Sequence, residues 1–361
     1  MALIEEIALT LIPNFGPRKL RTILQYFDLE EFFSVPKKRL REIPGIGEKT
    51  LIQLNRNEAI QKAKEYVNYL EKNEINSVFY QSDEFPYRLN QCEDAPILLF
   101  KKGKIHYNQP KVISVVGTRN ATSYGKRCID SFLEGLVNQN ILVVSGLAYG
   151  IDVYAHQKCV ELGIQTVGVL GHGLDRIYPA VHKSISEKML LNGGLISEFL
   201  PGTLPDREHF PMRNRIVAGM CDATIVIESG LKGGSMITAE LANDYSRDVF
   251  AFPGNVENEY SKGCNLLIKN QKAHLITNSK DFISWMNWDT KNESVSIQKS
   301  LFPNLTKEEQ FILDIIQTKK EISLDVLSLK TEMDSSKLSG LLLKLELEGI
   351  VQQLPGMRYK I

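Results

Sequence analysis

Residues 111–125 read KVISVVGTRNATSYG, a short apolar run that ends in a glycine and is followed by a polar loop. Five further apolar runs end in Gly, Ser or a charge: ILVVSG (141–146), QTVGVLG (165–171), GGLISEF (193–199), ATIVIES (223–229) and DVFAFPG (248–254). Such nearly continuous hydrophobicity is typical of strands buried on both faces, and the segments between them have helical patterns. The sequence therefore predicts an α/β fold with a mostly parallel, Rossmann-like sheet from about 111 to 281.

The pattern of apolar and polar residues changes along the chain and divides it into four regions. Apolar residues at three- and four-residue spacing predict a helical N-terminal domain, and a compact C-terminal segment has the pattern of a winged helix: three helices and a short hairpin. The expected boundaries are 1–72 for the helical domain, 73–285 for the extended Rossmann-like domain, 286–300 for a polar linker and 301–361 for the winged helix.

Composition places the protein among ordinary globular chains. Of 361 residues, 43% are apolar and 24% charged, and 43 Lys and Arg balance 43 Asp and Glu, so any nucleic-acid site must arise from local placement of charge. No basic-then-apolar signal layout and no apolar run of about 20 residues is present, which predicts a cytoplasmic protein that does not insert into a membrane. Five scattered cysteines without a CxxC pair are expected to be reduced core residues.

The loop after the first strand is the first candidate for binding phosphate. Gly117 permits a tight turn, the free N–H groups at the start of the next helix favour an anion, and Arg119 can bind a phosphate through two hydrogen bonds. The loop is not GxGxxG and no acidic residue follows at the distance that a ribose requires, so a dinucleotide site is not supported. The alternative is a plain strand-to-helix turn.

The loop after the second strand contains Ser145, Gly146 and Asp152, and His156 follows one helical turn later. A hydrolytic triad of Ser145, His156 and Asp152 is disfavoured because G-x-S-x-G is absent and the His and Asp have the i, i+4 spacing of a packing pair.

Residues 210–219, FPMRNRIVAG, are predicted to place Arg213, Asn214 and Arg215 in the first turn of a helix. Cations at this end of a helix oppose its dipole, so the arrangement is unfavourable for folding alone. An anion bound between the cations would compensate for it. The alternative is a buried ion pair with Glu198 or Glu228.

A fourth loop, GLKGGSMITAE (230–240), combines glycines, Ser235 and Thr238 into a set of N–H and hydroxyl donors, to which Lys232 adds charge. Four such loops on one sheet edge, with basic residues converging, predict a site for a polyphosphate or nucleic-acid backbone.

Six ordered motifs together resemble the DNA-processing protein A family (DprA, also called Smf) over about residues 75–285. They are VVGTRNATSYG, VVSGLAYGIDVYAH, VLGHGLDRIYP, FPMRNRIVAG, GGSMITAELA and VFAFPGNVENEYSKGCNLLIKNQKAHLI. The resemblance implies binding of single-stranded DNA without catalysis, dimerisation, and loading of a RecA-type recombinase during natural transformation, with no cofactor, metal or catalytic residue. The residues expected to contact phosphate or DNA are Gly117, Thr118, Arg119, Lys126, Ser145, Gly146, Phe210, Arg213, Asn214, Arg215, Lys232, Gly233, Gly234, Ser235 and Thr238.

The flanking regions carry weaker signals. IPGIGEKT (43–50) fits a helix-hairpin-helix turn in which Gly45, Gly47 and Lys49 would make accessory DNA contacts, and the alternative is a helical interaction domain that has lost DNA binding. From Leu301 onward, eight Lys and Arg stand against nine Asp and Glu, a net charge of −1, which favours protein contact over DNA readout.

Two rival functions remain open. GGSMITAE also resembles the phosphate loop of nucleotide phosphoribohydrolases, in which Glu240 would act on a ribosyl bond. The other is a transcription regulator that uses the C-terminal winged helix.

Overall fold

The computed structural model describes residues 2–288, 305–319, 322–331, 333–354 and 357–360. The chain divides into two compact units, Met1–Trp288 and Asp289–Ile361, each with its own apolar core. Most of the expected linker, residues 289–300, lies outside the described residues.

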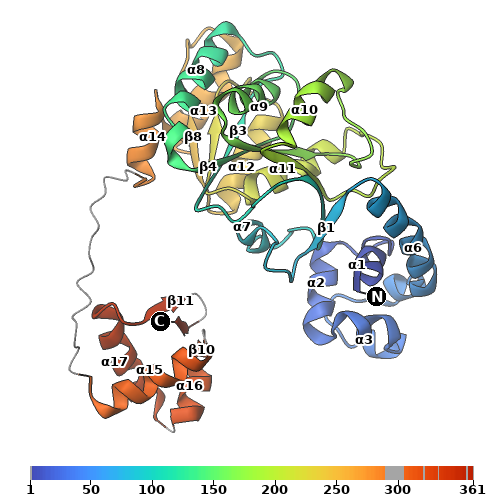
Figure 1. The fold of residues 1–361 in the computed structure, drawn as a ribbon, viewed down its shortest axis with the longest axis vertical. Coiled ribbons are helices and arrows are strands. Elements are labelled where there is room, and N and C mark those ends of the chain that lie inside the picture. Colours follow the sequence, from blue (N-terminus) through green and yellow to red (C-terminus); the bar gives the residue numbers. More distant parts are fainter. Residues whose placement is uncertain (1, 289–304, 320–321, 332, 355–356, 361) are drawn as a thin grey trace. The chain divides into compact units, whose positions relative to one another are not determined.

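The larger unit is built on a sheet that has nine strands in the described part of the chain, in the order β1-β2-β6-β5-β4-β3-β7-β8-β9 (Figure 1). β1 and β2 are antiparallel to their neighbours, and the strands from β6 to β9 are parallel. All six strands expected from the sequence are present, so the mostly parallel α/β class is confirmed. The bounds are β1 Asn76–Phe79, β2 Leu98–Gly103, β3 Lys111–Val116, β4 Ile141–Ser145, β5 Gln165–Leu170, β6 Gly193–Ser197, β7 Ala223–Val226, β8 Asp248–Ala251 and β9 His274–Leu275.

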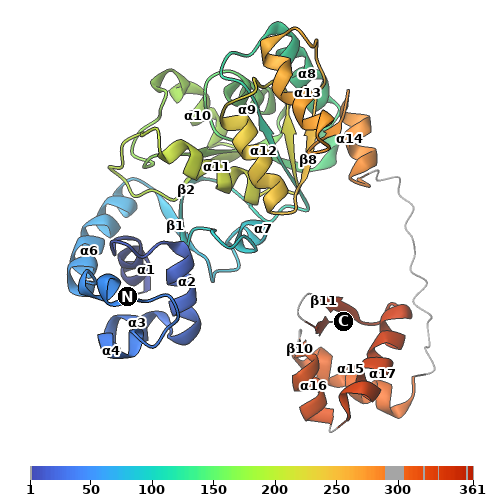
Figure 2. The same cartoon turned by 180° about the vertical axis from the view of Figure 1, so that it is seen from behind.

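Helices cover both faces of this sheet, because alternate residues of its strands point to opposite sides (Figures 1 and 2). Ile113 and Val115 of β3 belong to one apolar cluster, with α8, α9 and α14, whereas Val112 and Val116 belong to the other, with α11, α12 and α13. The bounds are α7 Tyr87–Asn90, α8 Ser123–Glu134, α9 Ile151–Leu162, α10 Lys183–Met189, α11 His209–Gly219, α12 Gly234–Asp244, α13 Lys262–Lys269 and α14 Ser279–Trp285.

The N-terminal helices pack against one end of the sheet. Leu20 and Phe32 from these helices share an apolar cluster with Phe100 and Leu195 from β2 and β6. Arg21 also joins the two regions, because its guanidinium donates to three backbone carbonyls of residues 90–96. The bounds are α1 Ala2–Thr10, α2 Pro17–Tyr26, α3 Leu29–Ser34, α4 Lys37–Leu40, α5 Glu48–Ile52 and α6 Arg56–Lys72.

The smaller unit has the three helices and the hairpin that the sequence predicts for a winged helix. Its sheet has the order β10-β12-β11, and its core contains Ile312, Leu327 and Leu342 from the three helices. Asp334 caps the last helix by accepting a hydrogen bond from the Ser336 N–H, as expected. The bounds are α15 Lys307–Lys319, β10 Ile322–Ser323, α16 Leu324–Thr331, α17 Ser335–Leu347, β11 Gln352–Leu354 and β12 Arg358–Lys360.

Candidate nucleic-acid interface

A cavity of about 790 Å³ opens at the carboxyl ends of β3, β4 and β7, where the chain switches from one half of the sheet to the other. Parallel α/β sheets bind ligands at such switch points, because loops and helix N-termini diverge there. We call this cavity the switch-point pocket. Among its lining residues are Gly117, Thr118, Arg119, Gly146, Asp152, Tyr178, Arg207, Phe210, Arg213, Asn214, Lys232, Gly233, Gly234, Ser235 and Thr238.

The loop between β3 and α8 is held rigidly by Glu228 at the end of β7. The Thr118 N–H donates to the Glu228 carbonyl at 2.7 Å, and the Glu228 carboxylate accepts from both the N–H (2.9 Å) and the hydroxyl (2.6 Å) of Thr122. Gly117 is required at this turn, since a side chain there would collide with Ile151 and with the Glu228 backbone. The loop therefore presents Arg119 from a fixed base.

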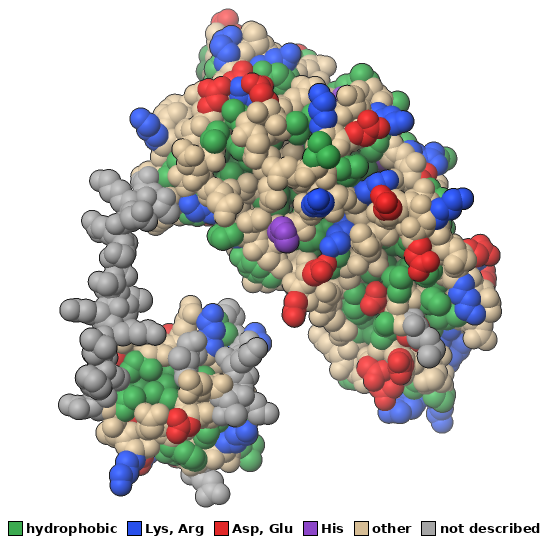
Figure 3. Space-filling view, viewed as in Figure 1, with side chains coloured by type: hydrophobic (Ala, Val, Ile, Leu, Met, Phe, Trp, Pro, Cys, Tyr) green, Lys and Arg blue, Asp and Glu red, His purple; other side chains and the backbone are tan. Residues whose placement is uncertain are grey.

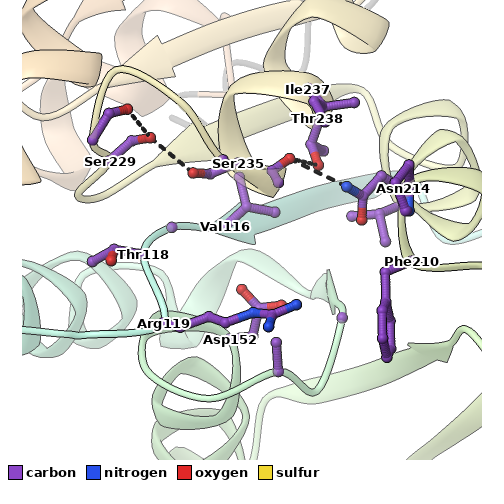
Figure 4. A pocket seen from close by; sticks show the side chains of 18 of the residues that line it. Val116, Thr118, Arg119, Asp152, Phe210, Asn214, Ser229, Ser235, Ile237 and Thr238 are labelled. Carbon is purple, nitrogen blue, oxygen red and sulfur yellow. Dashed lines mark hydrogen bonds between the residues drawn. The ribbon is translucent and has the colours of Figure 1, made fainter. Parts of the chain in front are cut away.

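Arg119 is exposed, and its guanidinium lies over the ring of Phe210 from α11, 5.7 Å from the ring centroid. Figure 4 shows these two side chains facing the same space as Asn214 and the start of α12. An exposed guanidinium beside an aromatic ring combines a phosphate contact with a surface on which a base can stack.

Arg213 lies at the floor of the pocket and is 5% exposed. Its Nη1 donates to the Val169 carbonyl at 2.8 Å, while its Nε has no hydrogen-bond partner among the described residues. Gly146 leaves the space that this guanidinium occupies, because a side chain at that position would collide with it. Burial lowers the pKa of Arg213, and the nearby Asp152 carboxylate acts in the opposite direction. Arginine nevertheless stays protonated in proteins, so the pocket has a buried positive charge.

The start of α12 forms the opposite wall. Gly233 precedes the helix without a side-chain cap, and Gly233, Gly234 and Ser235 line the pocket, so the N–H groups of this helix start are available to an anion there. The hydroxyl of Ser235 bonds to that of Ser229 at 2.9 Å, and Thr238 and Asn214 both donate to the Gly234 carbonyl. These polar side chains fix the wall, and the backbone amides remain the natural anion donors.

The structure thus brings together most of the residues that the sequence singled out, but not all. Lys126 lies over the Tyr154 ring, 5.4 Å from its centroid, and does not line the pocket. Ser145 is fully buried and donates to the Val115 carbonyl at 2.6 Å, so its hydroxyl serves the sheet.

Arg215 is also separated from the pocket, which corrects the expectation that it joins Arg119 and Arg213. Its guanidinium forms a buried ion pair with Glu198 and donates to the Asp94 carbonyl at 2.5 Å. Residues two apart on a helix point about 200° apart, so Arg213 and Arg215 occupy opposite faces of α11. For Arg215 the structure therefore confirms the alternative interpretation, a buried ion pair with Glu198.

The expected helix start at Arg213 is wrong as well. α11 begins at His209, so Arg213 lies in its second turn, and Pro211 is the third residue of the helix. Proline is tolerated in a first turn because its missing N–H would have no partner within the helix there. The cation at Arg213 therefore does not oppose the dipole at the helix start. The evidence for an anion site is instead the buried Arg213 guanidinium, whose Nε has no partner among the described residues.

Several lining residues were missed by the sequence reasoning, among them two tyrosines and an arginine. Tyr178 stacks on Phe210 with ring centroids 6.0 Å apart, Arg207 is exposed at the rim, and Tyr260 accepts a hydrogen bond from the Asn120 amide at 2.9 Å. The DRIYP segment before α10 contained the only usable signal, an aromatic residue next to a proline in a loop at a strand end.

Neither hydrolytic alternative is complete in this pocket, because Asp152 lines it but Ser145, His156 and Glu240 do not. His156 is fully buried, bonds through Nδ1 to the Thr166 hydroxyl at 2.7 Å, and has its pKa lowered to about 3, mainly by burial. Glu240, the acid of the phosphoribohydrolase hypothesis, is exposed, lies 3.5 Å from Lys272 and does not line the pocket.

The turn between α4 and α5 lies elsewhere on the unit. Gly45 has a left-handed backbone conformation (φ 82°), and neither it nor Gly47 lines the switch-point pocket. Two neighbouring cations have intramolecular partners: Lys37 donates to the Leu51 carbonyl and Arg41 pairs with Glu48. The side chain of Lys49 lies outside the described residues.

Within the described ranges, no three His, Cys, Asp or Glu side chains gather in a way that could hold a metal ion. The helices of these ranges also include none long and apolar enough to cross a membrane.

Comparisons with known proteins agree with one another. Residues 76–287 match the family model described as DNA recombination-mediator protein A, and residues 300–357 match that of the DprA winged helix domain. The chain is similar to Protein Smf of Synechocystis sp., with 31% identity over 97% of this chain and 96% of that protein.

Two solved structures are also similar. DNA processing protein A from Streptococcus pneumoniae superposes with a TM-score of 0.67 and 32% identity, covering 78% of this chain and 97% of that chain. The homonymous protein from Helicobacter pylori, described for its single-stranded DNA binding mode, gives a TM-score of 0.54 and 28% identity, covering 60% and 96%.

Proposed function

Because the chain belongs to the DNA-processing protein A (DprA/Smf) family, we propose that it binds single-stranded DNA in the switch-point pocket and acts in homologous recombination. The DNA-binding mode described for the Helicobacter pylori relative supports this assignment by similarity. The cytoplasm is the expected place of action.

One observation carries the proposal: the buried guanidinium of Arg213, the exposed guanidinium of Arg119 and the N-terminus of α12 face a single open cavity. The Asp152 carboxylate lies near Arg213, yet the Arg213 Nε has no hydrogen-bond partner among the described residues, and such a buried unpaired N–H is costly. A phosphate in the cavity can interact with the Arg213 guanidinium and with the N–H groups at the start of α12, and a second phosphate of the same strand can reach Arg119.

Aromatic groups at the rim favour an unpaired strand over duplex DNA. Tyr178 is 49% exposed and stacks on Phe210, which provides a surface for a base that is free of its partner. Stacking of this kind tolerates every base, so we expect no sequence specificity.

The central test is Arg119→Ala, assayed by oligo-dT titration at several salt concentrations with a duplex control. Loss of one charged phosphate contact should weaken binding and reduce the slope of log affinity against log salt by about 0.7. The matched control is Arg127→Ala, which removes an exposed arginine of α8 outside the pocket. A folded Arg119→Ala protein with wild-type affinity would exclude this residue from the site.

We further propose that the protein dimerises and loads a RecA-type recombinase onto the bound strand during natural transformation. The edge of the sheet at β9 supports self-association, since exposed Leu275 lies on this edge strand and His274 stacks on exposed Trp285. Sedimentation of wild type and Leu275→Asp tests the dimer. Strand exchange by a RecA-type recombinase on protein-coated single-stranded DNA tests loading.

A further inference from the structure

A second cavity, of about 520 Å³, lies between α6 and the loops at one end of the sheet. Its lining includes Tyr66 and Tyr69 from α6, Asp175 from the loop after β5, and Pro201 and Gly202 from the loop after β6. We call it the α6 pocket. Tyr69 is 38% exposed, whereas Tyr66 packs partly against the core.

The same two loops line both pockets. The loop of residues 171–178 contributes Asp175 to the α6 pocket and Tyr178 to the switch-point pocket. The loop of residues 200–208 contributes Gly202 to the first and Arg207 to the second.

Hydrogen bonds hold these loops side by side between the two pockets. The Gly173 N–H donates to the Thr203 carbonyl at 3.1 Å, and the Gly202 N–H donates to the Asp175 carboxylate at 2.8 Å. A side chain at Gly173 would collide with the backbone around Pro201, so the loops are in close contact there. The two loops that line both pockets are therefore held against each other, and we call the surface that they form between the pockets the strip.

The strip is short enough for one strand to occupy both pockets. Asp175 and Tyr178 are three residues apart, so their Cα atoms are at most about 11 Å from each other. At about 3.4 Å per stacked nucleotide, this corresponds to about three nucleotides. Leu204, on the second loop, is 61% exposed and adds apolar surface between the two pockets.

Charge decides which part of the strand suits the α6 pocket. Glu65 and Asp175 line it; Asp175 is paired with the neighbouring Arg176 at 2.7 Å, and the single lysine of the lining, Lys62, is paired with Glu58 at 2.6 Å. The lining thus has no unpaired cation for a phosphate, whereas its tyrosine rings and Pro201 offer the apolar surface that a nucleobase requires.

We propose that single-stranded DNA leaving the switch-point pocket passes along this strip and stacks a nucleobase on Tyr69 in the α6 pocket. The inference rests on the proposed function and extends it by giving the N-terminal helices a share in binding the strand. The occupant is a base of the same strand whose phosphates lie at Arg119 and Arg213.

The test compares oligo-dT of about 4 nucleotides, which fills the switch-point pocket alone, with oligo-dT of about 12 nucleotides, which reaches both. Tyr69→Ala should leave binding of the short oligonucleotide unchanged and weaken binding of the long one about five- to tenfold, as expected for loss of one stacked base. Tyr69→Trp should restore the affinity for the long oligonucleotide. The control is Tyr26→Ala, which removes an exposed tyrosine of α2 that lines neither pocket.

A second measurement separates base from backbone contacts. A single abasic site, moved along the long oligonucleotide, should weaken both proteins where a base stacks in the switch-point pocket, and should weaken only the wild type at the position that reaches Tyr69. Equal affinity of Tyr69→Ala and wild type for the long oligonucleotide overturns the inference, as does equal weakening for both lengths. Absence of any binding by the wild type refutes the proposed function instead.

Discussion

At the scale of single residues, the larger unit contains a fully buried histidine, His156. This residue lies in α9, and burial, together with the nearby Arg213 and His182, lowers its pKa to about 3. Its Nδ1 bonds to the Thr166 hydroxyl, while its Nε2 has no partner among the described residues. The folded protein thus excludes a proton that the unfolded chain accepts near pH 6.5.

We therefore predict that acid destabilises the larger unit through His156. The unfolded chain binds this proton below about pH 6.5 and the folded one only near pH 3, so the stabilisation is complete above about pH 6.5 and decreases as the pH falls. Urea unfolding of wild type and His156→Asn should show their difference in unfolding free energy changing by about 2 kcal/mol between pH 7 and pH 5. A difference that is independent of pH would contradict the assignment.

Single residues also mark the limit of what the sequence predicts about the site. Gly117 and Arg119 could be assigned because a glycine and a basic residue follow a recognisable strand. Arg213 and Arg215 could not be told apart, because their separation depends on where α11 begins and on which face of it meets Glu198. Tyr178 was missed because its partner, Phe210, is distant in the sequence.

At the scale of elements, Arg21 fastens α2 to the rest of the larger unit. Its Nε donates to the Ala95 carbonyl at 3.2 Å, and its two Nη atoms donate to Asn90 and Pro96, each at 3.3 Å. Its guanidinium also lies 4.6 Å from the centroid of the Tyr80 ring. One side chain thus holds the helical region against the segment that precedes β2.

Arg21→Ala should reduce the unfolding free energy by about 2 kcal/mol, because it leaves three carbonyls without a charged donor. Hydrogen exchange should rise in α2 and in residues 90–96 while β3 and β4 stay protected. Arg18→Ala is the matched control. The side chains of Arg18 and its ion-pair partner Glu93 are 70% and 84% exposed, and such exposed pairs contribute less than about 1 kcal/mol to the unfolding free energy. Equal effects of the two variants would rule out this role of Arg21.

Six strands of the sheet could be predicted because each is a nearly pure apolar run. Which strand pairs with which could not be predicted. The antiparallel addition of β2 to β6 and the edge position of β9 depend on contacts between segments far apart in the chain. Periodicity within a segment does not contain that information.

At the scale of the whole molecule, charge is balanced and dispersed. The formal net charge is zero, and on the face drawn in Figure 3 basic and acidic side chains are interspersed. For the proposed binding of single-stranded DNA, we therefore expect affinity to come mainly from the cations of the switch-point pocket rather than from long-range attraction.

The two units have separate cores, so we predict that they unfold independently. At the start of α15, the Thr306 N–H donates to Glu309 at 2.8 Å, the Glu309 N–H donates to the Thr306 hydroxyl at 3.3 Å, and Lys344 donates to Glu309 at 2.7 Å. Glu309→Ala should destabilise the smaller unit by about 1 to 2 kcal/mol and leave the transition of the larger one unchanged. Urea unfolding followed by hydrogen exchange resolves the two, and a shift in both transitions would show that they are coupled.

The reversal of strand order beside β3 has a consequence for biosynthesis. Gly117 leaves the ribosome early, but β7 and the α12 wall that complete the pocket are made only after β4, β5 and β6 have been added on the other side. A nascent chain that stalls before Gly234 can therefore assemble half of the sheet while lacking one wall of the cavity. The proposed binding site is thus completed late in translation, and products truncated before Gly234 should not bind single-stranded DNA.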